Sequence, residues 1–223
     1  MKLPPIGSYI STSFIDWPGR VVAVIFTKGC NWRCPFCHNG PLALGVAEEL
    51  DVGAILDDIA RRASFLDGVA VSGGEPTIHG SLPSLLRRIK GAGLAVKLDT
   101  NGSNPSAIGE LLNEGLIDAV AMDIKGPWDK YERLAGVTID VELVKRSVEL
   151  LKSSSIDVEF RTTYVPHLMD EEDLHMVRCQ VEPGRWVIQL VDTRLALDPA
   201  LVGTASPERA RVAEAFPDVP IRG

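Results

Sequence analysis

What the sequence lacks excludes several classes of protein. No run of about 18 apolar residues occurs among its 223 residues, so no segment is long enough to cross a bilayer as a helix. The first ten residues contain one Lys but not the apolar stretch that a secretory signal peptide places after it. Lys and Arg are scattered and the net charge is −7, which gives no basic surface for nucleic acid. These absences predict a cytoplasmic protein that binds neither membranes nor nucleic acids.

Cysteine is also scarce, with four residues in the whole chain, but three of the four lie within eight residues. Cys30, Cys34 and Cys37 belong to the segment GCNWRCPFCHNG (residues 29–40), and Cys179 lies far from them in sequence. In the cytoplasm, clustered cysteines are metal ligands or catalysts more often than disulfides. The segment therefore predicts a metal or redox centre.

Several kinds of centre compete for this segment. A zinc site would use the three cysteines and His38, but adjacent Cys37 and His38 cannot easily point at one tetrahedral ion. The CPFCH sequence fits a haem-attachment pattern, whose covalent chemistry takes place outside the cytoplasm. A redox pair of Cys34 and Cys37 leaves Cys30 without a role, and the Gly, Asn and Pro residues mark a loop instead of an apolar core. An iron–sulfur cluster with three thiolates and one open iron uses all three cysteines.

Short runs rich in Val and Ile alternate with amphipathic stretches along the chain. Near-continuous apolar strands indicate burial on both faces, as in a parallel sheet. The predicted strands are residues 21–28, 68–72, 95–99, 118–125, 157–165 and 185–191. The predicted helices are residues 52–64, 82–92, 105–115, 141–153 and 170–178. This order predicts an α/β fold, an incomplete TIM-like (β/α)6 barrel of about six parallel strands, with an open doubly wound sheet as the alternative.

No linker, internal repeat or low-complexity tract interrupts this order. We therefore expect a single domain over residues 1–223, with its core at about residues 13–191. The tail, residues 198–223, contains several Pro and Gly residues, and we expect it to be irregular with one short helix around residues 207–215.

Unusual segments follow the predicted strands at one end. GCNWRCPFCHNG follows the first strand, SGGEPT (residues 72–77) the second and DTNG (residues 99–102) the third, while MDIK (residues 122–125) closes the fourth. Arg161 lies within the fifth. Because function in parallel α/β folds collects at the carboxyl ends of strands, we expect these segments to form one site on one rim.

The cysteine spacing resembles that of a known family. The C-x3-C-x2-C pattern, with Phe36 just before the third cysteine, is similar to the cluster loop of radical S-adenosylmethionine (SAM) enzymes, and SGGEP (residues 72–76) stands at the distance that this family shows. The resemblance implies a 4Fe-4S cluster whose fourth iron is chelated by the amino and carboxylate groups of SAM. One electron from the cluster would cleave the sulfonium C–S bond, giving methionine and a 5′-deoxyadenosyl radical. The implied cluster ligands are Cys30, Cys34 and Cys37.

Further motifs resemble the glycyl-radical-enzyme activating proteins, a branch of the same family. They are CHN (residues 37–39), DWPG (residues 16–19), DTNG and MDIK, within a resemblance that covers roughly residues 13–165. The most similar branch is that of the anaerobic ribonucleoside-triphosphate reductase activating proteins, with pyruvate formate-lyase activase as a near relative. This implies that the radical abstracts a hydrogen atom from a glycine of a partner glycyl radical enzyme.

The resemblance also implies a set of cofactor-binding residues. Glu75 would accept a hydrogen bond from the SAM ammonium group. Asp99 and Asp123 end adjacent strands, and neighbouring carboxylates repel unless a cation or proton lies between them. Asp99, Thr100 and Asp123 match the place where relatives bind a monovalent cation. Lys125 and Arg161 would recognise the SAM carboxylate, and an ordinary ion-pair network at the rim is the alternative. The full implied set is Gly73, Gly74, Glu75, Asp99, Thr100, Asn101, Asp123, Lys125 and Arg161.

The small number of cysteines also bears on the electron source. One cysteine remains besides the implied cluster ligands, so a second all-cysteine cubane is excluded, and we expect a separate flavodoxin- or ferredoxin-like electron donor. We expect Cys179 to be a buried apolar residue and His167 a surface residue. His38 and Asn39 are candidates for contact with adenine or with a substrate peptide. Two other functions stay open: a radical SAM enzyme acting on a small molecule such as a deazapurine precursor, and a non-catalytic redox or iron-responsive binding module.

Overall fold

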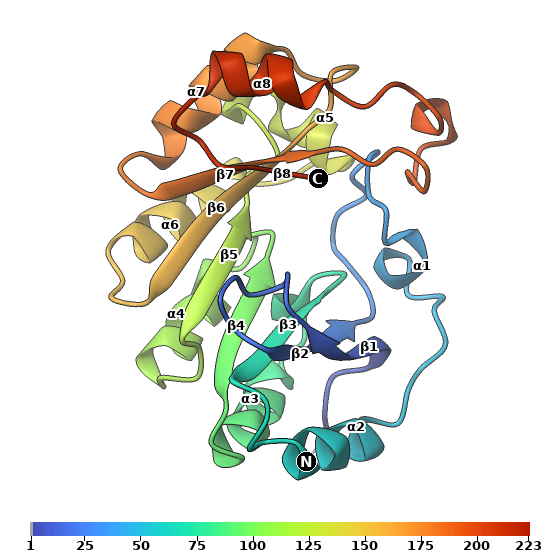
Figure 1. Cartoon of the computed structure of the whole chain (residues 1–223), viewed down its shortest axis with the longest axis vertical. Helices are drawn as coiled ribbons and strands as arrows, with labels where there is room; N and C mark the ends of the chain where they lie inside the picture. The colour runs from blue at the N-terminus through green and yellow to red at the C-terminus, as the bar shows by residue number, and fades with distance from the viewer. Residues whose placement is uncertain (1) are drawn as a thin grey trace.

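The strands of the computed structural model, which describes residues 2–223, form one sheet in the order β1 to β8 (Figure 1). The edge strand β1 (Ile6–Ser13) pairs antiparallel with β2, and β8 (Ile221–Arg222) extends the sheet beyond β7 in parallel. Between them lie parallel strands, namely β2 (Val22–Thr27), β3 (Gly68–Gly73), β4 (Ala95–Thr100), β5 (Ala119–Asp123), β6 (Asp157–Tyr164) and β7 (Arg185–Leu190).

The sequential strand order decides between the two predicted architectures. A doubly wound sheet reverses its order at a switch point, whereas here each parallel strand lies beside the one that precedes it in the chain. The sheet is open, because β1 and β8 stand at opposite ends of the order. The predicted α/β fold, an incomplete TIM-like barrel, is confirmed.

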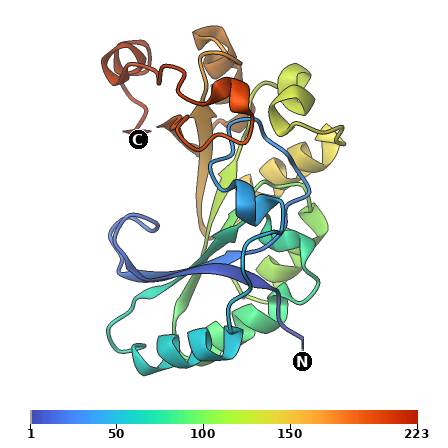
Figure 2. The same cartoon turned by 90° about the vertical axis from the view of Figure 1, so that its right-hand side faces the viewer.

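Helices connect the successive parallel strands and lie along one face of the sheet, while the β1–β2 turn and the C-terminus lie on the other side (Figure 2). They are α2 (Val52–Arg61), α3 (Leu82–Gly91), α4 (Pro105–Asn113), α6 (Val141–Lys152) and α7 (Glu171–Val181). The shorter helices are α1 (Gly40–Ala43), α5 (Tyr131–Ala135) and α8 (Arg209–Ala215), with 3-10 turns η1 (Pro76–Ile78), η2 (Trp128–Lys130) and η3 (Pro199–Leu201).

Local sequence explains where the connecting helices begin. Asp51 caps α2 by accepting from Gly53 N at 2.8 Å. Asp170 and Asp173 cap α7 with reciprocal side-chain to backbone hydrogen bonds of 2.9 and 3.1 Å, which form a capping box. Each such cap satisfies a helix N–H group that has no partner within the helix, and is worth about 1 kcal/mol.

The sheet is buried on both faces near β2 and β3, as its apolar strands predicted. The larger core lies between the sheet and the helices. A smaller apolar cluster on the other face contains Trp17, Val22, Val24, Ala70 and Ala119. Trp17 comes from the β1–β2 turn and fills the space above these small side chains, and it is 5% exposed. The turn therefore closes part of the barrel interior.

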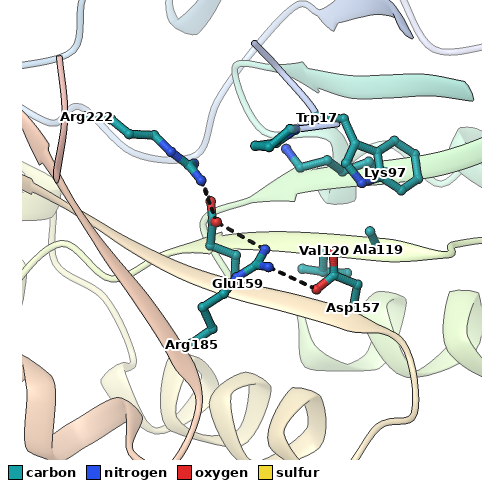
Figure 3. Close-up of a pocket in the computed structure, with 9 residues that line it drawn as sticks. Trp17, Lys97, Ala119, Val120, Asp157, Glu159, Arg185 and Arg222 are labelled. Carbon is teal, nitrogen blue, oxygen red and sulfur yellow. Dashed lines mark hydrogen bonds and ion pairs between the residues drawn. The ribbon is translucent and has the colours of Figure 1, made fainter. Parts of the chain in front are cut away.

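The tail is more regular than predicted. The expected helix is present as α8, but the tail also returns to the sheet as β8. Arg222 of β8 makes two hydrogen bonds, of 2.6 and 2.8 Å, with the buried Glu159 of β6, and Arg185 contacts the same carboxylate at 3.1 Å (Figure 3). These residues border a small cavity of about 70 Å³ together with Trp17 and Lys97. Because β8 has only two residues, hydrophobic periodicity in the sequence could not predict this strand.

Besides β8, the elements not predicted from the sequence are β1, the short helices α1 and α5, and the 3-10 turns η1, η2 and η3. Within the described residues, no helix is long and apolar enough to cross a membrane.

Candidate functional site

A cavity of about 450 Å³ lies at the carboxyl ends of the parallel strands. Its walls include every residue that the sequence singled out for the cluster and the cofactor. They are Cys30, Cys34, Cys37, Gly73, Gly74, Glu75, Asp99, Thr100, Asn101, Asp123, Lys125 and Arg161. The structure thus brings together residues that the chain separates by up to about 130 positions, because consecutive β/α units deliver their loops to the same rim.

The cysteine loop follows β2 and is held by backbone hydrogen bonds to two short helices. Cys30 N donates to Ala43 O of α1 at 3.1 Å. Arg33 N donates to Ala135 O, the last residue of α5, at 2.8 Å. Beneath the loop, the rings of Trp32 and the fully buried Tyr131 of α5 meet edge to face at 5.8 Å. The two helices that the sequence did not predict therefore support the loop that it did predict.

The three cysteines differ in their surroundings. Cys34 is buried, whereas Cys30 and Cys37 are partly exposed. Burial raises the pKa of the Cys34 thiol to about 11, and the positive charge of Lys125 opposes this shift. Burial also raises the pKa of Cys30, against a hydrogen bond of 3.3 Å from Trp32 N to its sulfur. The site therefore favours thiols until positive charge, such as that of a metal centre, stabilises the thiolates.

The arrangement of the cysteines also bears on the kind of metal centre. Among residues 2–223, no three His, Cys, Asp or Glu side chains converge closely enough to hold a single metal ion. A cubane cluster does not need such convergence, because each thiolate binds a different iron. Three soft thiolates on the wall of a 450 Å³ cavity thus fit an iron–sulfur cluster better than one tetrahedral ion.

The two glycines after β3 are required by the protein's own backbone. Gly73 has φ +126° and a Cβ there would overlap the backbone of Thr27, while a Cβ on Gly74 would overlap the carbonyl of Gly29. Gly74 N donates to Thr27 O, and Glu75 N donates to Gly29 O, each at 2.9 Å. The two glycines therefore allow close contact with the end of β2 and the start of the cysteine loop.

Glu75 lines the cavity, but it is 1% exposed and its carboxylate is engaged within the protein. Its Oε1 accepts from Thr77 N, Thr77 Oγ1 and Thr100 Oγ1, at 3.0, 2.5 and 2.7 Å. Its Oε2 accepts from Asn101 N at 2.6 Å. Burial raises the pKa of Glu75, while these four donors favour the carboxylate. In the structure Glu75 joins the loops after β3 and β4.

Asp99 and Asp123 face each other across β4 and β5, and Arg161 of β6 bridges them. Its guanidinium contacts Asp99 Oδ2 at 3.1 Å through Nη1 and Asp123 Oδ1 at 3.0 Å through Nε. Lys97 also pairs with Asp99, and Lys125 Nζ lies 3.1 Å from Asp123 Oδ2. The position where a monovalent cation was expected is thus taken by Arg161.

This network sets the charge of one wall of the cavity. Burial alone would raise the pKa of Asp123, but the charges of Arg161 and Lys125 outweigh it and lower the pKa to about 2. Burial lowers the pKa of Lys125 and Arg161, but their acidic partners reverse this and raise both. All three groups therefore stay ionised at neutral pH. The charged side chains that line the cavity are two cations, Lys125 and Arg161, and five carboxylates, Asp16, Glu75, Asp99, Asp123 and Asp192. The two cations are the groups that suit the binding of a carboxylate.

Some lining residues were not singled out from the sequence. Thr163 and Gln189 lie near the carboxyl ends of β6 and β7, where the same rim rule could have found them. The other lining residues outside the sequence motifs are Phe26, Ala43, Leu190, Val191, Asp192 and Leu195. Asp16, Trp32, Phe36, His38, Asn39 and Ser72 also line the cavity, and all six belong to motifs that the sequence singled out.

Two residues outside the site complete the comparison with the sequence. Cys179 is exposed on α7, so the prediction of a buried apolar residue is wrong. It falls between the buried positions of the helix, next to Arg178. His167 is exposed in the loop after β6 and does not line the cavity, as expected.

Comparisons with known proteins find one matching family model and several similar sequences. The family model of the Radical SAM superfamily matches residues 24–179. A Methanocaldococcus jannaschii protein assigned as a glycyl-radical enzyme activating enzyme is 37% identical over 199 residues, or 86% of this chain and 82% of that protein. Pyruvate formate-lyase 1-activating enzyme of Escherichia coli K12 is 29% identical over 178 residues, or 75% and 70%. A Thermococcus kodakarensis protein assigned as a GTP 3',8-cyclase is 28% identical over 178 residues, or 78% and 57%.

Among solved structures, Streptococcus suis SuiB bound to S-adenosylmethionine is similar to this chain, with a TM-score of 0.66 over 90% of it and 16% identity. This chain spans about half the length of SuiB, 49%. At this identity the likeness concerns the fold.

Proposed function

The chain belongs to the radical SAM superfamily, and we propose that it activates a glycyl radical enzyme. Membership implies a 4Fe-4S cluster and SAM as cofactors. When bound and reduced by one electron, they supply a 5′-deoxyadenosyl radical and methionine, and the radical takes a hydrogen atom from a glycine Cα to give 5′-deoxyadenosine. The observation that carries the proposal is the cavity that brings three cysteines together with the cations of Lys125 and Arg161, in a chain 37% identical to the M. jannaschii protein.

The residues of the cavity divide into two functions. Cys30, Cys34 and Cys37 would hold the cluster. Lys125 and Arg161 would attract the SAM carboxylate, since they are the two cations that line the cavity. We include no monovalent cation in the proposal, because it would have to compete with Arg161 for both carboxylates.

The site residues implied by the resemblance keep their places in the proposal, with adjusted contacts. Gly73 and Gly74 would offer backbone groups to the SAM amino group at the cavity wall. Asp99 and Asp123 would hold the two cations in position. Thr100 and Asn101 would act through the loops that they fix, since both are buried beside Glu75.

The partner that we propose is a glycyl radical enzyme of the anaerobic ribonucleoside-triphosphate reductase type. Its glycine would reach the cavity as part of a peptide loop, past lining residues that the cofactor roles leave free, such as Asp16, Gln189 and Leu195. Leu195 is 71% exposed, which provides apolar surface for such a loop. A flavodoxin- or ferredoxin-like protein would supply the electron, because the single cysteine outside the loop cannot hold another cluster.

A small-molecule substrate is the second candidate. The similarity to the T. kodakarensis protein assigned as a GTP 3',8-cyclase favours it, although this chain spans 57% of that protein. The similarity to the M. jannaschii protein is higher and spans 82% of its length, which favours the activase.

Electron paramagnetic resonance tests the proposal directly. The reconstituted, reduced chain would be mixed with SAM and, in turn, with each glycyl radical enzyme of its source organism. We expect a glycine-centred doublet with one of them, and none when that partner's radical glycine is replaced by alanine. No doublet with any partner, together with turnover of a purine nucleotide precursor, would favour the second candidate.

A further inference from the structure

We propose that Asn101 is a positioning residue for the cysteine loop, and that its side-chain amide donates a hydrogen bond to the sulfur of Cys30. The inference rests on the proposed cluster, but it assigns Asn101 to the cluster loop, whereas the resemblance implied a contact with SAM. Asn101 is 5% exposed and lies in the loop after β4. It bridges three loops that are far apart in sequence.

The backbone of Asn101 is fixed from the side of β3. Its N–H donates to Glu75 Oε2 at 2.6 Å, and the neighbouring Thr100 Oγ1 donates to Glu75 Oε1 at 2.7 Å. Glu75 is itself tied to the cysteine loop through its own N–H, which donates to Gly29 O at 2.9 Å. A buried carboxylate with this many donors leaves the Asn101 backbone little freedom.

The side chain of Asn101 has one orientation that satisfies its neighbours. Ser103 N can only donate, and it lies 2.9 Å from Asn101 Oδ1, so the carboxamide oxygen faces Ser103. The amide nitrogen Nδ2 must then face the cysteine loop, where it lies 3.0 Å from Asn31 Oδ1 and 4.0 Å from Cys30 Sγ. Asn31 Nδ2 in turn donates to Ser103 Oγ at 2.9 Å. The ring of contacts therefore aims an N–H donor at the Cys30 sulfur.

The three cysteine sulfurs are not equivalent in this respect. Cys30 Sγ has Trp32 N at 3.3 Å and Asn101 Nδ2 at 4.0 Å, whereas no donor within hydrogen-bond reach of Cys34 or Cys37 Sγ is found among residues 2–223. Hydrogen bonds to the sulfurs of a cluster help to set its reduction potential. They stabilise the reduced form, which carries more negative charge, so loss of the Asn101 donor shifts the potential to more negative values.

The test is a redox titration of the cluster in the full-length chain, with dithionite as reductant and electron paramagnetic resonance as readout. It compares the wild type with Asn101→Asp, which keeps the size of the side chain but replaces the donor, and with Asn101→Ala. Ser103→Ala is the matched control, since it removes the Asn31 contact and leaves the backbone donor to Asn101. We expect both Asn101 variants to change the ratio of oxidised to reduced cluster at least tenfold, about 59 mV for one electron. Ser103→Ala should keep the wild-type potential.

A wild-type potential in Asn101→Asp would overturn the inference, and so would an equal shift in Ser103→Ala, which would mean that any loosening of the loop has this effect. If Asn101→Ala takes up no iron while Ser103→Ala does, the positioning role is supported, and Asn101→Asp still reports on the hydrogen bond. A different result would refute the proposed function. A potential shift without a glycyl radical on any partner would refute the activase and leave the role of Asn101 intact.

Discussion

Gly136 lies directly against Arg33 of the cysteine loop. Gly136 ends α5 with φ +71°, and a Cβ at this position would overlap the carbonyl group of Arg33. The preceding residue, Ala135, accepts from Arg33 N at 2.8 Å. The short helix α5 thus fixes the position of the cysteine loop, which lies about a hundred residues earlier in the chain. The contact suggests that a substitution far from the cysteines in sequence can displace them.

Replacement of Gly136 by Ala should impair iron uptake. Alanine at positive φ costs roughly 1–3 kcal/mol, and the overlap with Arg33 additionally forces the cysteine loop to move. Gly115→Ala is the matched control, because Gly115 has φ +63° and no atom within 4 Å of its Cβ position. Iron and sulfide content after anaerobic reconstitution, with urea unfolding of both variants, measures the effect. Equal iron content in two equally destabilised variants would mean that the contact with Arg33 is unimportant.

Much of the fold could be predicted because its signals are local. The six parallel strands and five connecting helices appear within a few residues of their predicted bounds, since apolar periodicity and caps such as Asp51 are properties of short segments. β8 and α5 were missed because they have two and five residues, too few for a period. They form through contacts with distant residues, Glu159 for β8 and Arg33 for α5.

The site was predictable as a set of residues but not as a set of contacts. The carboxyl ends of parallel strands lie at one rim, so the motifs that follow these strands are expected there whichever contacts their side chains make. Which partner each side chain takes depends on packing between loops, and the sequence holds no local sign of it. Glu75, for example, accepts a hydrogen bond of 2.6 Å from Asn101 N, a pair that no local pattern indicates. Arg161 lies between Asp99 and Asp123 because β4, β5 and β6 are neighbours in the sheet.

Replacing each cysteine in turn distinguishes a cluster held by three cysteines from one held by all four. Alanine at Cys30, Cys34 or Cys37 should abolish the cluster, because each thiolate holds a different iron. Cys179→Ala should leave it intact, since Cys179 is exposed on α7 and outside the cavity. The visible absorbance of the reconstituted proteins and their iron content measure this. Loss of the cluster in Cys179→Ala would replace the model of three ligands with a site of four cysteines.

Replacement of Arg161 should weaken the binding of SAM. Arg161→Gln removes the cation that bridges Asp99 and Asp123, which leaves the wall with less positive charge for a carboxylate. The loss of one member of a desolvated charged contact costs roughly 2–5 kcal/mol, so the affinity should fall thirtyfold or more. Arg185→Gln is the control, because Arg185 pairs with Glu159 outside this cavity. Anaerobic titration of SAM into proteins of equal iron content gives both values. An unchanged affinity in Arg161→Gln would make the network purely structural.

The low pKa of Asp123 predicts how the folding stability of the chain depends on pH. The charges of Arg161 and Lys125 lower its pKa to about 2 in the folded chain, against about 3.9 for an unfolded Asp. A lowered pKa contributes stability that is fully present above the unfolded value and is lost as the pH falls toward the folded one. The difference in unfolding free energy between the wild type and Asp123→Asn should therefore be constant from pH 7 to about pH 5. It should shrink steadily from about pH 4 downward, as the unfolded chain begins to take up the proton.

Urea unfolding of the cluster-free proteins at a series of pH values measures this difference. Glu110→Gln serves as the control, since Glu110 is exposed on α4 and its replacement should leave the unfolding free energy close to that of the wild type throughout. A difference between the wild type and Asp123→Asn that stays constant from pH 7 to pH 3 would show that Asp123 has an ordinary carboxyl environment. The ion pairs with Arg161 and Lys125 would then not form in solution, and Asp123 would not hold these two cations in the cavity.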